Sequence, residues 1–302
     1  MSSTPNSIVR VDDFEPVLDR AVSVVIPAFN EGSHVADEVR AVEGVLAGSG
    51  WKYEILVVDD GSSDDTAQRA LESGARVLSR RMNRGYGAAL KLGVRHAQHP
   101  WILITDADGT YPVDAIPLLL AQSDANSMVV GARTGASVKI PLARRPAKAF
   151  LRWLASYLAG RDLPDINSGL RLMRKELIQR YEHILPDGFS FTTTITLAST
   201  CNGHPVEYIS INYRARLGQS KIRPRHAYDF TLLILRTIVF FNPLKVFIPL
   251  GVILALAGLA KLAYDIVKNN LSESAIFALL AAMIVWAVGL LADQNSRMAL
   301  RR

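Results

Sequence analysis

Two apolar stretches near the end of the chain, residues 244–264 and 275–292, limit its possible folds more than any other feature. Each has about the length of an α-helix that crosses the hydrocarbon core of a bilayer, and a short polar linker joins them. They explain a mean hydropathy of +0.17, which is high for a wholly soluble chain of 302 residues. A helical hairpin buried in a soluble domain is the alternative, but Gly251, Gly258 and many alanines suit helix packing in lipid. The sequence therefore predicts a two-helix transmembrane hairpin carried by a domain outside the membrane.

Basic residues around this hairpin predict its orientation. Lys245 and Lys261 lie near the two ends of the first span, where their side chains can reach the headgroups. The short C-terminal tail is basic, with Arg301 and Arg302 at its end, whereas the linker 265–274 carries no positive excess. Because basic segments stay on the cytoplasmic side, we expect a multi-pass membrane protein with two spans whose globular domain and both termini are cytoplasmic.

Charge and cysteine content narrow the possible partners. A formal net charge of +6 and a pI near 9.5 favour an anionic partner, such as a nucleic acid or an acidic membrane surface. The sequence has no Lys/Arg-rich arm and no zinc-finger spacing, so we expect no nucleic-acid partner. The single cysteine, Cys201, excludes an internal disulfide framework. Residues 1–20 are polar and acidic without an apolar core, which predicts a flexible tail rather than a signal peptide.

Upstream of the hairpin, short β-rich runs alternate with segments of helical periodicity. This alternation predicts an α/β domain with a mostly parallel sheet and right-handed crossovers. We place the domain at 21–226, a juxtamembrane interfacial helix at 227–243 and the hairpin with its tail at 244–302. The expected strands span residues 21–27, 53–58, 75–78 and 101–104, and the expected helices span 33–46, 66–73 and a third segment that ends at residue 97.

Carboxylates follow three of these strands. Asp106 and Asp108 come directly after a buried strand, while Glu31 and Asp60 follow two others. Side chains at i and i+2 of an extended chain point to the same side, so Asp106 and Asp108 can close on one hard cation such as Mg²⁺ or Mn²⁺. A lone Asp-x-Asp is more often an acidic turn. Carboxylates at three strand ends instead favour a ligand site at the carboxyl edge of the sheet.

Two common nucleotide-binding motifs are missing from the sequence. Gly85-x-Gly87 would need a third glycine at position 90, where Leu90 stands, and no Gly-Lys-Ser/Thr phosphate loop occurs. The glycines therefore favour neither a dinucleotide-binding fold nor a P-loop.

Four motifs, in this order along the chain, resemble those of the family 2 glycosyltransferases. They are Val24-Val25-Ile26-Pro27-Ala28-Phe29-Asn30-Glu31, Val57-Val58-Asp59-Asp60-Gly61-Ser62, Asn83-x-Gly85-x-Gly87 and Asp106-Ala107-Asp108. The resemblance implies the GT-A fold, a Rossmann-like mixed sheet that is mostly parallel and flanked by helices. It also implies a nucleotide-sugar donor and a divalent metal cofactor, Mg²⁺ or Mn²⁺, held by Asp106 and Asp108. The implied donor-binding residues are Pro27, Phe29, Glu31, Val58, Asp60, Asp106, Ala107 and Asp108.

Two further segments resemble one branch of that family. Val129-Val130-Gly131-Ala132-Arg133 is similar to its Gly-Ser/Ala-Arg strand, and Asp165-Ile166-Asn167-Ser168-Gly169-Leu170-Arg171 to its Asp-x-x-Ser-Gly-Phe-Arg segment. This branch includes dolichyl-phosphate mannose and glucose synthases, which move one hexose from a nucleotide sugar to a polyprenyl phosphate. The metal motif continues as Gly109-Thr110-Tyr111-Pro112, closer to the glucose than to the mannose type, so UDP-glucose and GDP-mannose both stay open.

The acceptor phosphate is expected to meet basic residues. Residues 144–159 alternate basic and apolar positions at helical spacing, which predicts either an interfacial helix that brings Arg144 or Arg145 to the lipid phosphate or an ordinary amphipathic helix on the core. The loop at 213–221 resembles the branch's Arg-x-Gly-x-Ser-Lys loop. The expected phosphate-binding residues are Arg133, Arg145, Arg216, Ser220 and Lys221, and the expected catalytic residues are Asp108, Arg133, Asp165 and Arg216.

A lipid phosphate is its own nucleophile, so the reaction needs no strong general base, and a single displacement would invert the sugar's anomeric centre. Three rivals remain. A processive polysaccharide synthase would need Gln-x-x-Arg-Trp, but Ala149 stands where the glutamine belongs. A transferase to a lipid hydroxyl would need a base, for which Asp165 is the candidate. A non-catalytic membrane scaffold is the third. A homo-oligomer is possible, and polyprenol length, pathway and oligomeric state stay open.

Overall fold

The computed structural model describes residues 20–134, 153, 156–157, 159–213, 239–240, 242–269 and 272–300. The predicted interfacial helix at 144–159 and the predicted juxtamembrane helix at 227–243 lie mostly outside the described residues, as does almost all of the N-terminal tail. Trp153, Ser156, Tyr157 and Ala159 are helical, and the exposed rings of Trp153 and Tyr157 stack with centroids 5.9 Å apart.

The described residues of the domain form one seven-stranded sheet with the order β3-β2-β1-β4-β6-β5-β7. Strands β1 to β4 run parallel, and β6 runs antiparallel to both of its neighbours, β4 and β5, while β7 pairs parallel with β5. The prediction of a mixed, mostly parallel sheet is confirmed. The strands are β1 (Ala21–Ala28), β2 (Lys52–Asp59), β3 (Arg76–Ser79), β4 (Trp101–Ile104), β5 (Met128–Ala132), β6 (Arg171–Arg174) and β7 (Val206–Ser210).

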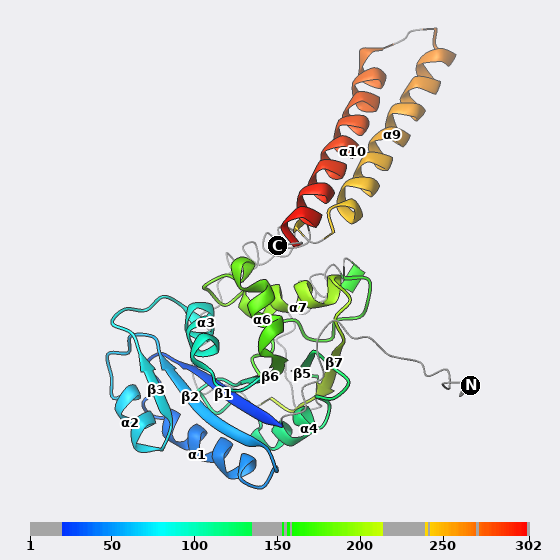
Figure 1. The fold of residues 1–302 in the computed structure, drawn as a ribbon. Helices are drawn as coiled ribbons and strands as arrows, with labels where there is room; N and C mark the ends of the chain where they lie inside the picture. The colour runs from blue at the N-terminus through cyan, green and yellow to red at the C-terminus, as the bar shows by residue number, and fades with distance from the viewer. Residues whose placement is uncertain are drawn as a thin grey trace, which may run out of the picture.

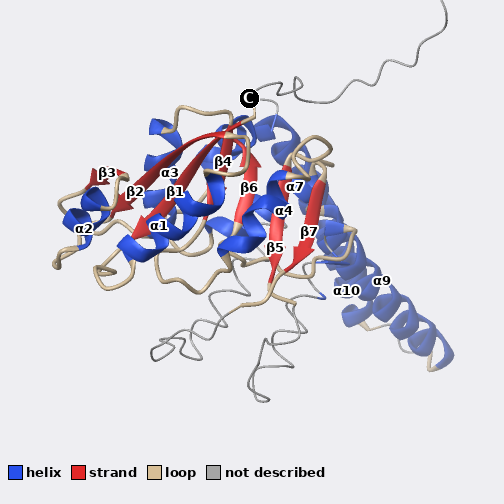
Figure 2. Ribbon diagram, turned by 90° about the horizontal axis from the view of Figure 1, so that it is seen from below, coloured by secondary structure: helices blue, strands red, loops and turns tan. Residues whose placement is uncertain are grey.

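Helices cover both faces of this sheet because its central strands are apolar on both sides. In β1, Val22, Val24 and Ile26 face one core cluster, and Val25 faces the other. Helices α1, α2 and α4 lie on the first face and α3, α6 and α7 on the second, as Figures 1 and 2 show. The helices are α1 (Val35–Leu46), α2 (Thr66–Glu72), α3 (Tyr86–His96), α4 (Ile116–Leu120), α6 (Lys175–Tyr181) and α7 (Phe191–Cys201), with short 3-10 turns η1 (Val113–Ala115) and η3 (Glu182–Ile184).

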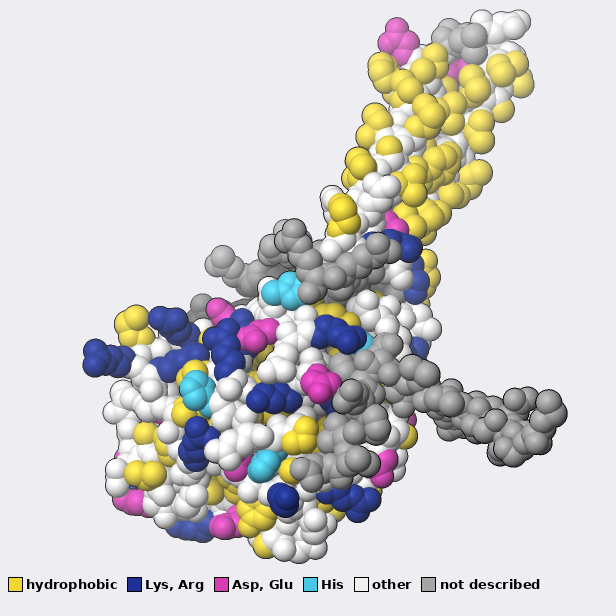
Figure 3. Space-filling view, in the orientation of Figure 1, with side chains coloured by type: hydrophobic (Ala, Val, Ile, Leu, Met, Phe, Trp, Pro, Cys, Tyr) yellow, Lys and Arg dark blue, Asp and Glu magenta, His cyan; other side chains and the backbone are white. Residues whose placement is uncertain are grey.

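Two long helices, α9 (Leu244–Val267) and α10 (Glu273–Leu300), form a hairpin that projects from the domain (Figure 1). Both are long and apolar enough to cross a membrane, and their most apolar windows are only 11% and 17% buried. A core hairpin of a soluble domain would be mostly buried. Figure 3 shows hydrophobic side chains covering the hairpin, while charged side chains are scattered over this face of the described part of the domain. This contrast is that of a membrane protein.

Small residues bring the two hairpin helices together. Gly251 lies against the Trp286 ring and Gly289 against Phe247, so a β-carbon at either position would overlap its neighbour. At the end far from the domain, the Asp265 carboxylate accepts hydrogen bonds from Lys261 and Ser272. The hairpin is thus closely packed along its length and polar at its far end, as a membrane-spanning pair would be.

Candidate functional site

The strand order brings the predicted carboxylates to one edge of the sheet. Strands β2, β1 and β4 are neighbours and run in parallel, so the residues that follow them, including Asp60, Glu31 and Asp106, share their carboxyl edge. Strand β5 ends at the same edge, just before Arg133, and β6 begins there, with Arg171 opposite both Ile104 and Val130. The fold therefore brings residues from separate motifs to one edge of the sheet.

Asp106 and Asp108 are both partly buried in the turn after β4. The Tyr86 hydroxyl donates to Asp106 Oδ1 at 3.0 Å, and Asp108 Oδ1 accepts from the Thr110 hydroxyl at 2.6 Å and the Thr110 amide at 3.2 Å. A β-carbon on Gly169 would lie 2.9 and 3.0 Å from the two Asp106 oxygens, so the glycine gives that carboxylate its space. Both carboxylates are held in place from outside the motif itself.

Asp60 organises the turn between β3 and α3. Its carboxylate accepts from the amides of Arg84 (3.0 Å) and Gly85 (2.7 Å), and it pairs with the Arg80 guanidinium at 3.2 Å. The side chain is almost fully buried. Asp60 therefore contributes first to the shape of the Asn83-x-Gly85-x-Gly87 turn, a role that its position after a strand did not predict.

The loop after β1 is tied to the loop after β2. Asn30 adopts a left-handed conformation with φ of 56°, and its side-chain oxygen accepts from the Ser63 amide at 2.9 Å. The amides of Asn30 and Glu31 donate to the hydroxyls of Ser62 and Thr66. Between these ties the Phe29 side chain is 46% exposed, available to a planar ligand.

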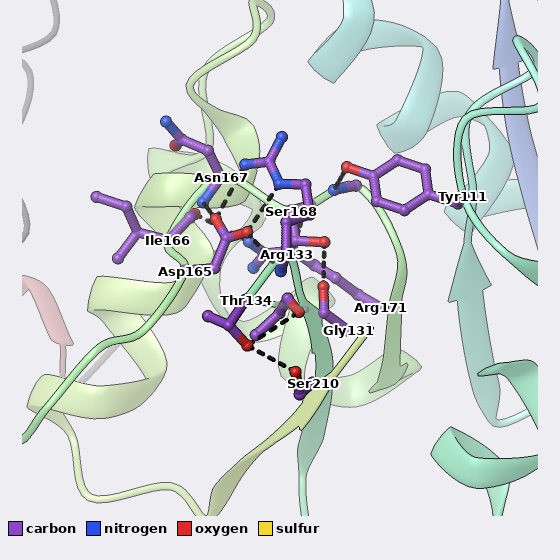
Figure 4. A network of polar contacts seen from close by, with 12 residues as sticks. Tyr111, Gly131, Arg133, Thr134, Asp165, Ile166, Asn167, Ser168, Arg171 and Ser210 are labelled. Atoms are coloured by element: carbon purple, nitrogen blue, oxygen red, sulfur yellow. Dashed lines mark hydrogen bonds and ion pairs between the residues drawn. The ribbon is translucent and has the colours of Figure 1, made fainter. Parts of the chain in front are cut away.

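Arg133 follows β5, and Asp165 lies in the segment before β6. The two side chains form a bidentate ion pair (Figure 4). Arg133 Nε donates to Asp165 Oδ2 at 2.7 Å and Nη2 to Oδ1 at 3.0 Å, and the Arg133 amide also donates to Oδ2. The Asn167 amide completes the set at 3.0 Å. This geometry fixes the guanidinium plane.

The electrostatics of this pair follow from its burial. Burial alone would raise the pKa of Asp165, but the Arg133 guanidinium and the amides of Arg133 and Asn167 outweigh it and hold the pKa at about 2. Burial likewise opposes the charge on Arg133, and Asp165 more than compensates, so the pKa of Arg133 is raised. Both groups are charged throughout the physiological range. Asp165 is therefore a poor general base, which counts against the lipid-hydroxyl rival.

Arg171 is fully buried and fastens the segment that carries Asp165 to helix α7. Its guanidinium donates to the carbonyls of Ser168 (2.6 Å) and Ile166 (2.9 Å) on one side, and to the Thr192 carbonyl (3.0 Å) and Thr196 hydroxyl (2.6 Å) on α7. Burial lowers the pKa of Arg171. Its partners are neutral oxygens, so its role is to position the loop.

Two tyrosines connect these parts of the site. The Tyr111 hydroxyl accepts a hydrogen bond from the Gly169 amide at 2.6 Å (Figure 4). The Tyr111 ring also contacts the Tyr213 ring edge-on, with ring centroids 5.2 Å apart. Burial and the charge of Asp106 raise the pKa of Tyr86, and the same two causes raise that of Tyr111. Each hydroxyl keeps its proton at neutral pH and can donate a hydrogen bond.

The other predicted residues divide into two groups. Pro27, Val58 and Ala107 are buried, with Val58 in the core cluster beneath α3 and Ala107 in the core cluster beneath α1. Arg145, Arg216, Ser220 and Lys221 lie outside the described residues. Sequence reasoning missed Tyr86, Tyr111 and Arg171, although each stands inside or next to a motif that it quoted. Within the described ranges, no group of three or more His, Cys, Asp or Glu side chains is arranged to hold a metal.

Two family descriptions match the chain. Glycosyl transferase family 2 matches residues 23–182, and the GtrB C-terminal hairpin matches residues 242–298. The first covers the sheet through β6 and every described site residue up to Arg171. The second covers α9 and nearly all of α10.

Curated relatives resemble most of the chain. An undecaprenyl-phosphate 4-deoxy-4-formamido-L-arabinose transferase of Klebsiella pneumoniae is 31% identical over 252 residues, which is 80% of this chain and 74% of the relative. A dolichyl-phosphate hexose transferase of Haloferax volcanii is 33% identical over 210 residues, 67% of this chain and 87% of the relative.

Solved structures share the fold of the domain. Glucosyl-3-phosphoglycerate synthase from Mycobacterium tuberculosis, crystallised with Mn²⁺, uridine diphosphate and phosphoglyceric acid, has a TM-score of 0.58 and 22% identity, covering 73% of this chain and 78% of the neighbour. Its complex with phosphoglyceric acid gives a TM-score of 0.56 at 24% identity. These likenesses confirm the predicted fold of the domain.

Proposed function

We propose, from the premise that the chain belongs to glycosyl transferase family 2, that it transfers one hexose from a nucleotide sugar to a polyprenyl phosphate at a membrane surface. The observation that carries the proposal is the union, in one chain, of a family 2 domain with a GtrB-type hairpin. Two relatives that align with most of this chain are named for transfer to undecaprenyl or dolichyl phosphate. The match confirms the resemblance that the sequence motifs indicated.

The donor and a metal are assigned to the carboxyl edge of the sheet. Asp106 and Asp108 provide the hard oxygen ligands that Mg²⁺ or Mn²⁺ prefers, and Gly169 leaves the space beside Asp106 that a larger residue would fill. Two carboxylates are few for such an ion, which suits one whose other ligands are diphosphate oxygens and water. When bound, the metal supplies positive charge against the leaving diphosphate. The Mn²⁺ and UDP in the neighbouring synthase support this assignment.

Arg133 is assigned to the acceptor phosphate. Asp165 accepts from Nε and from one hydrogen of Nη2, so the ion pair fixes the plane of the guanidinium and leaves Nη1 and the second hydrogen of Nη2 to donate to a phosphate oxygen. Asp165 thereby acts as a positioning residue. Arg145, Arg216, Ser220 and Lys221 remain proposed partners of the same phosphate.

The chemistry needs alignment more than acid or base catalysis. A lipid phosphate is already anionic at neutral pH, so its oxygen can attack the anomeric carbon directly and displace the nucleoside diphosphate with inversion. The domain holds two anions in line, which supplies the entropic part of catalysis. We assign the domain and both termini to the cytoplasmic side.

Transfer of labelled sugar tests the reaction. Detergent-solubilised full-length protein is incubated with radiolabelled UDP-glucose or GDP-mannose and a short polyprenyl phosphate, with Mn²⁺ or EDTA. We expect EDTA-sensitive lipid label from one donor, lost in Asp108→Ala and kept in Asp114→Ala. Asp114 is a matched control because it is exposed and lies just past the site.

Reactions with different lipid acceptors distinguish the alternative functions. Label on polyprenol or diacylglycerol with none on polyprenyl phosphate would overturn the acceptor assignment. Label that persists in EDTA and in Asp108→Ala would overturn the metal assignment. The relatives are named for different sugars, a formamido-arabinose and a hexose, so a silent result is followed by a wider donor panel. Failure across that panel would favour an inactive scaffold.

Topology has its own test. The chain has one cysteine, so Cys201→Ala provides a background for single-cysteine labelling. Asn269→Cys, in the connection between α9 and α10, should react with a membrane-impermeant maleimide from outside intact cells. Ser63→Cys, in the domain, should react only after lysis. The reverse pattern would overturn the cytoplasmic assignment.

A further inference from the structure

A side chain at the turn before α3 reaches one of the two predicted metal carboxylates. Tyr86 is the first residue of α3, and its hydroxyl donates to Asp106 Oδ1 at 3.0 Å. Asp106 follows β4, whereas this turn follows β3. In the sheet, β2 and β1 lie between these two strands. A residue from a separate motif therefore touches the carboxylate that the metal would use.

The backbone of this turn packs closely against the loop that precedes α7, as one hydrogen bond and two glycines show. Gly85 has a φ of 103°, and a β-carbon there would lie 2.6 Å from the Asp187 carbonyl oxygen. A β-carbon on Gly87 would overlap the Pro186 carbonyl oxygen. The Ala88 amide donates to the Asp187 carbonyl at 3.0 Å. Only glycine permits so close an approach of the two backbones.

Side chains extend this clamp to the tyrosine ring. Phe189 stacks on Tyr86 with ring centroids 5.6 Å apart and planes inclined by 21°. Lys91, one turn into α3, pairs with the Asp187 carboxylate at 2.5 Å. The Tyr86 ring is thus fixed by its own backbone, by the stacked ring and by the bond to Asp106.

The phenylalanine of this clamp is itself 84% exposed, so it buries little apolar surface there. Its contribution to folding by burial is correspondingly small. The consequence of the stack is the orientation of Tyr86.

We propose that Tyr86 is a positioning residue for the metal site: its hydroxyl orients the Asp106 carboxylate toward the ion, and Phe189 holds the tyrosine in place. The inference rests on the proposed function, because it takes Asp106 as a metal ligand. Partners that hydrogen-bond to metal ligands orient them, and their loss commonly lowers metal affinity about 10- to 100-fold. Removing one hydroxyl should fall at the lower end of that range.

Mn²⁺ binding tests the role apart from turnover. Free Mn²⁺ is titrated by electron paramagnetic resonance against full-length protein in detergent with saturating UDP. Tyr86→Phe keeps the stack on Phe189 and removes the hydroxyl, so we expect Mn²⁺ to bind about 10-fold more weakly with an unchanged melting temperature. Phe189→Leu should give a smaller loss of Mn²⁺ affinity. Phe189→Tyr, which keeps an aromatic ring, should bind Mn²⁺ with wild-type affinity.

Tyr181→Phe is the matched control. It also removes a buried tyrosine hydroxyl, the one that contacts His204 Nε2 at 2.9 Å at the C-terminal end of α6, and it should leave Mn²⁺ affinity unchanged. Wild-type affinity in Tyr86→Phe, with binding abolished in Asp106→Ala, would overturn the inference and leave the metal assignment standing. Wild-type affinity in Asp106→Ala, or no Mn²⁺ binding by the wild type, would overturn both.

Discussion

The ion pair with Arg133 makes the charge of the buried Asp165 carboxylate a contributor to the folding free energy of the domain. The Asp165 side chain is 5% exposed and that of Arg133 is 21% exposed, so the pair is neither a surface salt bridge nor fully dry. Holding the Asp165 pKa at about 2 instead of its ordinary 3.8 corresponds to about 2 kcal/mol of folding free energy at neutral pH. Asp165→Asn removes this charge while nearly preserving shape.

We expect Asp165→Asn to lower the melting temperature of the full-length protein by roughly 4–8 °C, since about 1 kcal/mol shifts a domain of this size by about 2–4 °C. The folded pKa is depressed, so this contribution is complete above the ordinary pKa and is lost as the pH falls. The gap between wild type and variant should therefore narrow from about pH 4 toward pH 2.

Differential scanning fluorimetry in detergent measures both effects. Asp124→Asn is the matched control, because Asp124 pairs with Arg20 at 3.8 Å and both side chains are mostly exposed. Such a pair contributes about 0.5 kcal/mol, so its loss should shift the melting temperature by about 1–2 °C. Equal shifts for Asp165→Asn and Asp124→Asn at neutral pH, or a gap that persists unchanged at low pH, would refute the reasoning.

Three further substitutions test other parts of the fold by the same melting assay. Gly87→Ala places a methyl group against the Pro186 carbonyl, so it should destabilise the protein and weaken Mn²⁺ binding together, and a stable variant with normal binding would contradict the close packing of that turn. Gly44→Ala, exposed inside α1 with nothing near its β-carbon, should stabilise by up to about 1 kcal/mol, and destabilisation would show that the helix is strained there. Arg171→Met leaves the Ser168 and Ile166 carbonyls without their donor, so it should destabilise by about 3 kcal/mol or more, and a shift no larger than that of Asp124→Asn would remove its assigned positioning role.

The carboxyl edge of the sheet could be predicted from sequence because its information is local. Strands β2 and β4 are short apolar runs that are followed by carboxylates, and their parallel arrangement places Asp60 and Asp106 at the same edge. The observed β1, β2 and β3 lie within one or two residues of the predicted bounds.

The partners of those residues could not be predicted in the same way. Arg133 and Asp165 are 32 positions apart and meet because β6 inserts antiparallel between β4 and β5, an arrangement that alternation of strands and helices does not encode. Asp60 was expected to face the donor, whereas its carboxylate is also occupied by two backbone amides and Arg80. Tyr86 stands between two motif glycines, so its position, though not its contact, was visible in the sequence.

The polar residues of the hairpin helices define the length of the apolar segments, which can be compared with the thickness of a bilayer. At 1.5 Å per residue, Lys245 and Lys261 are about 24 Å apart along α9, and the apolar run from Ala275 to Ala292 in α10 covers about 26 Å. Both are shorter than the roughly 30 Å hydrocarbon core of a typical bilayer. A short hairpin gains nothing by tilting, so it should stand close to the membrane normal and thin the lipid around it. Acyl-chain length thus becomes a variable of the reaction: transfer in nanodiscs should be faster with shorter-chain lipids than with longer ones.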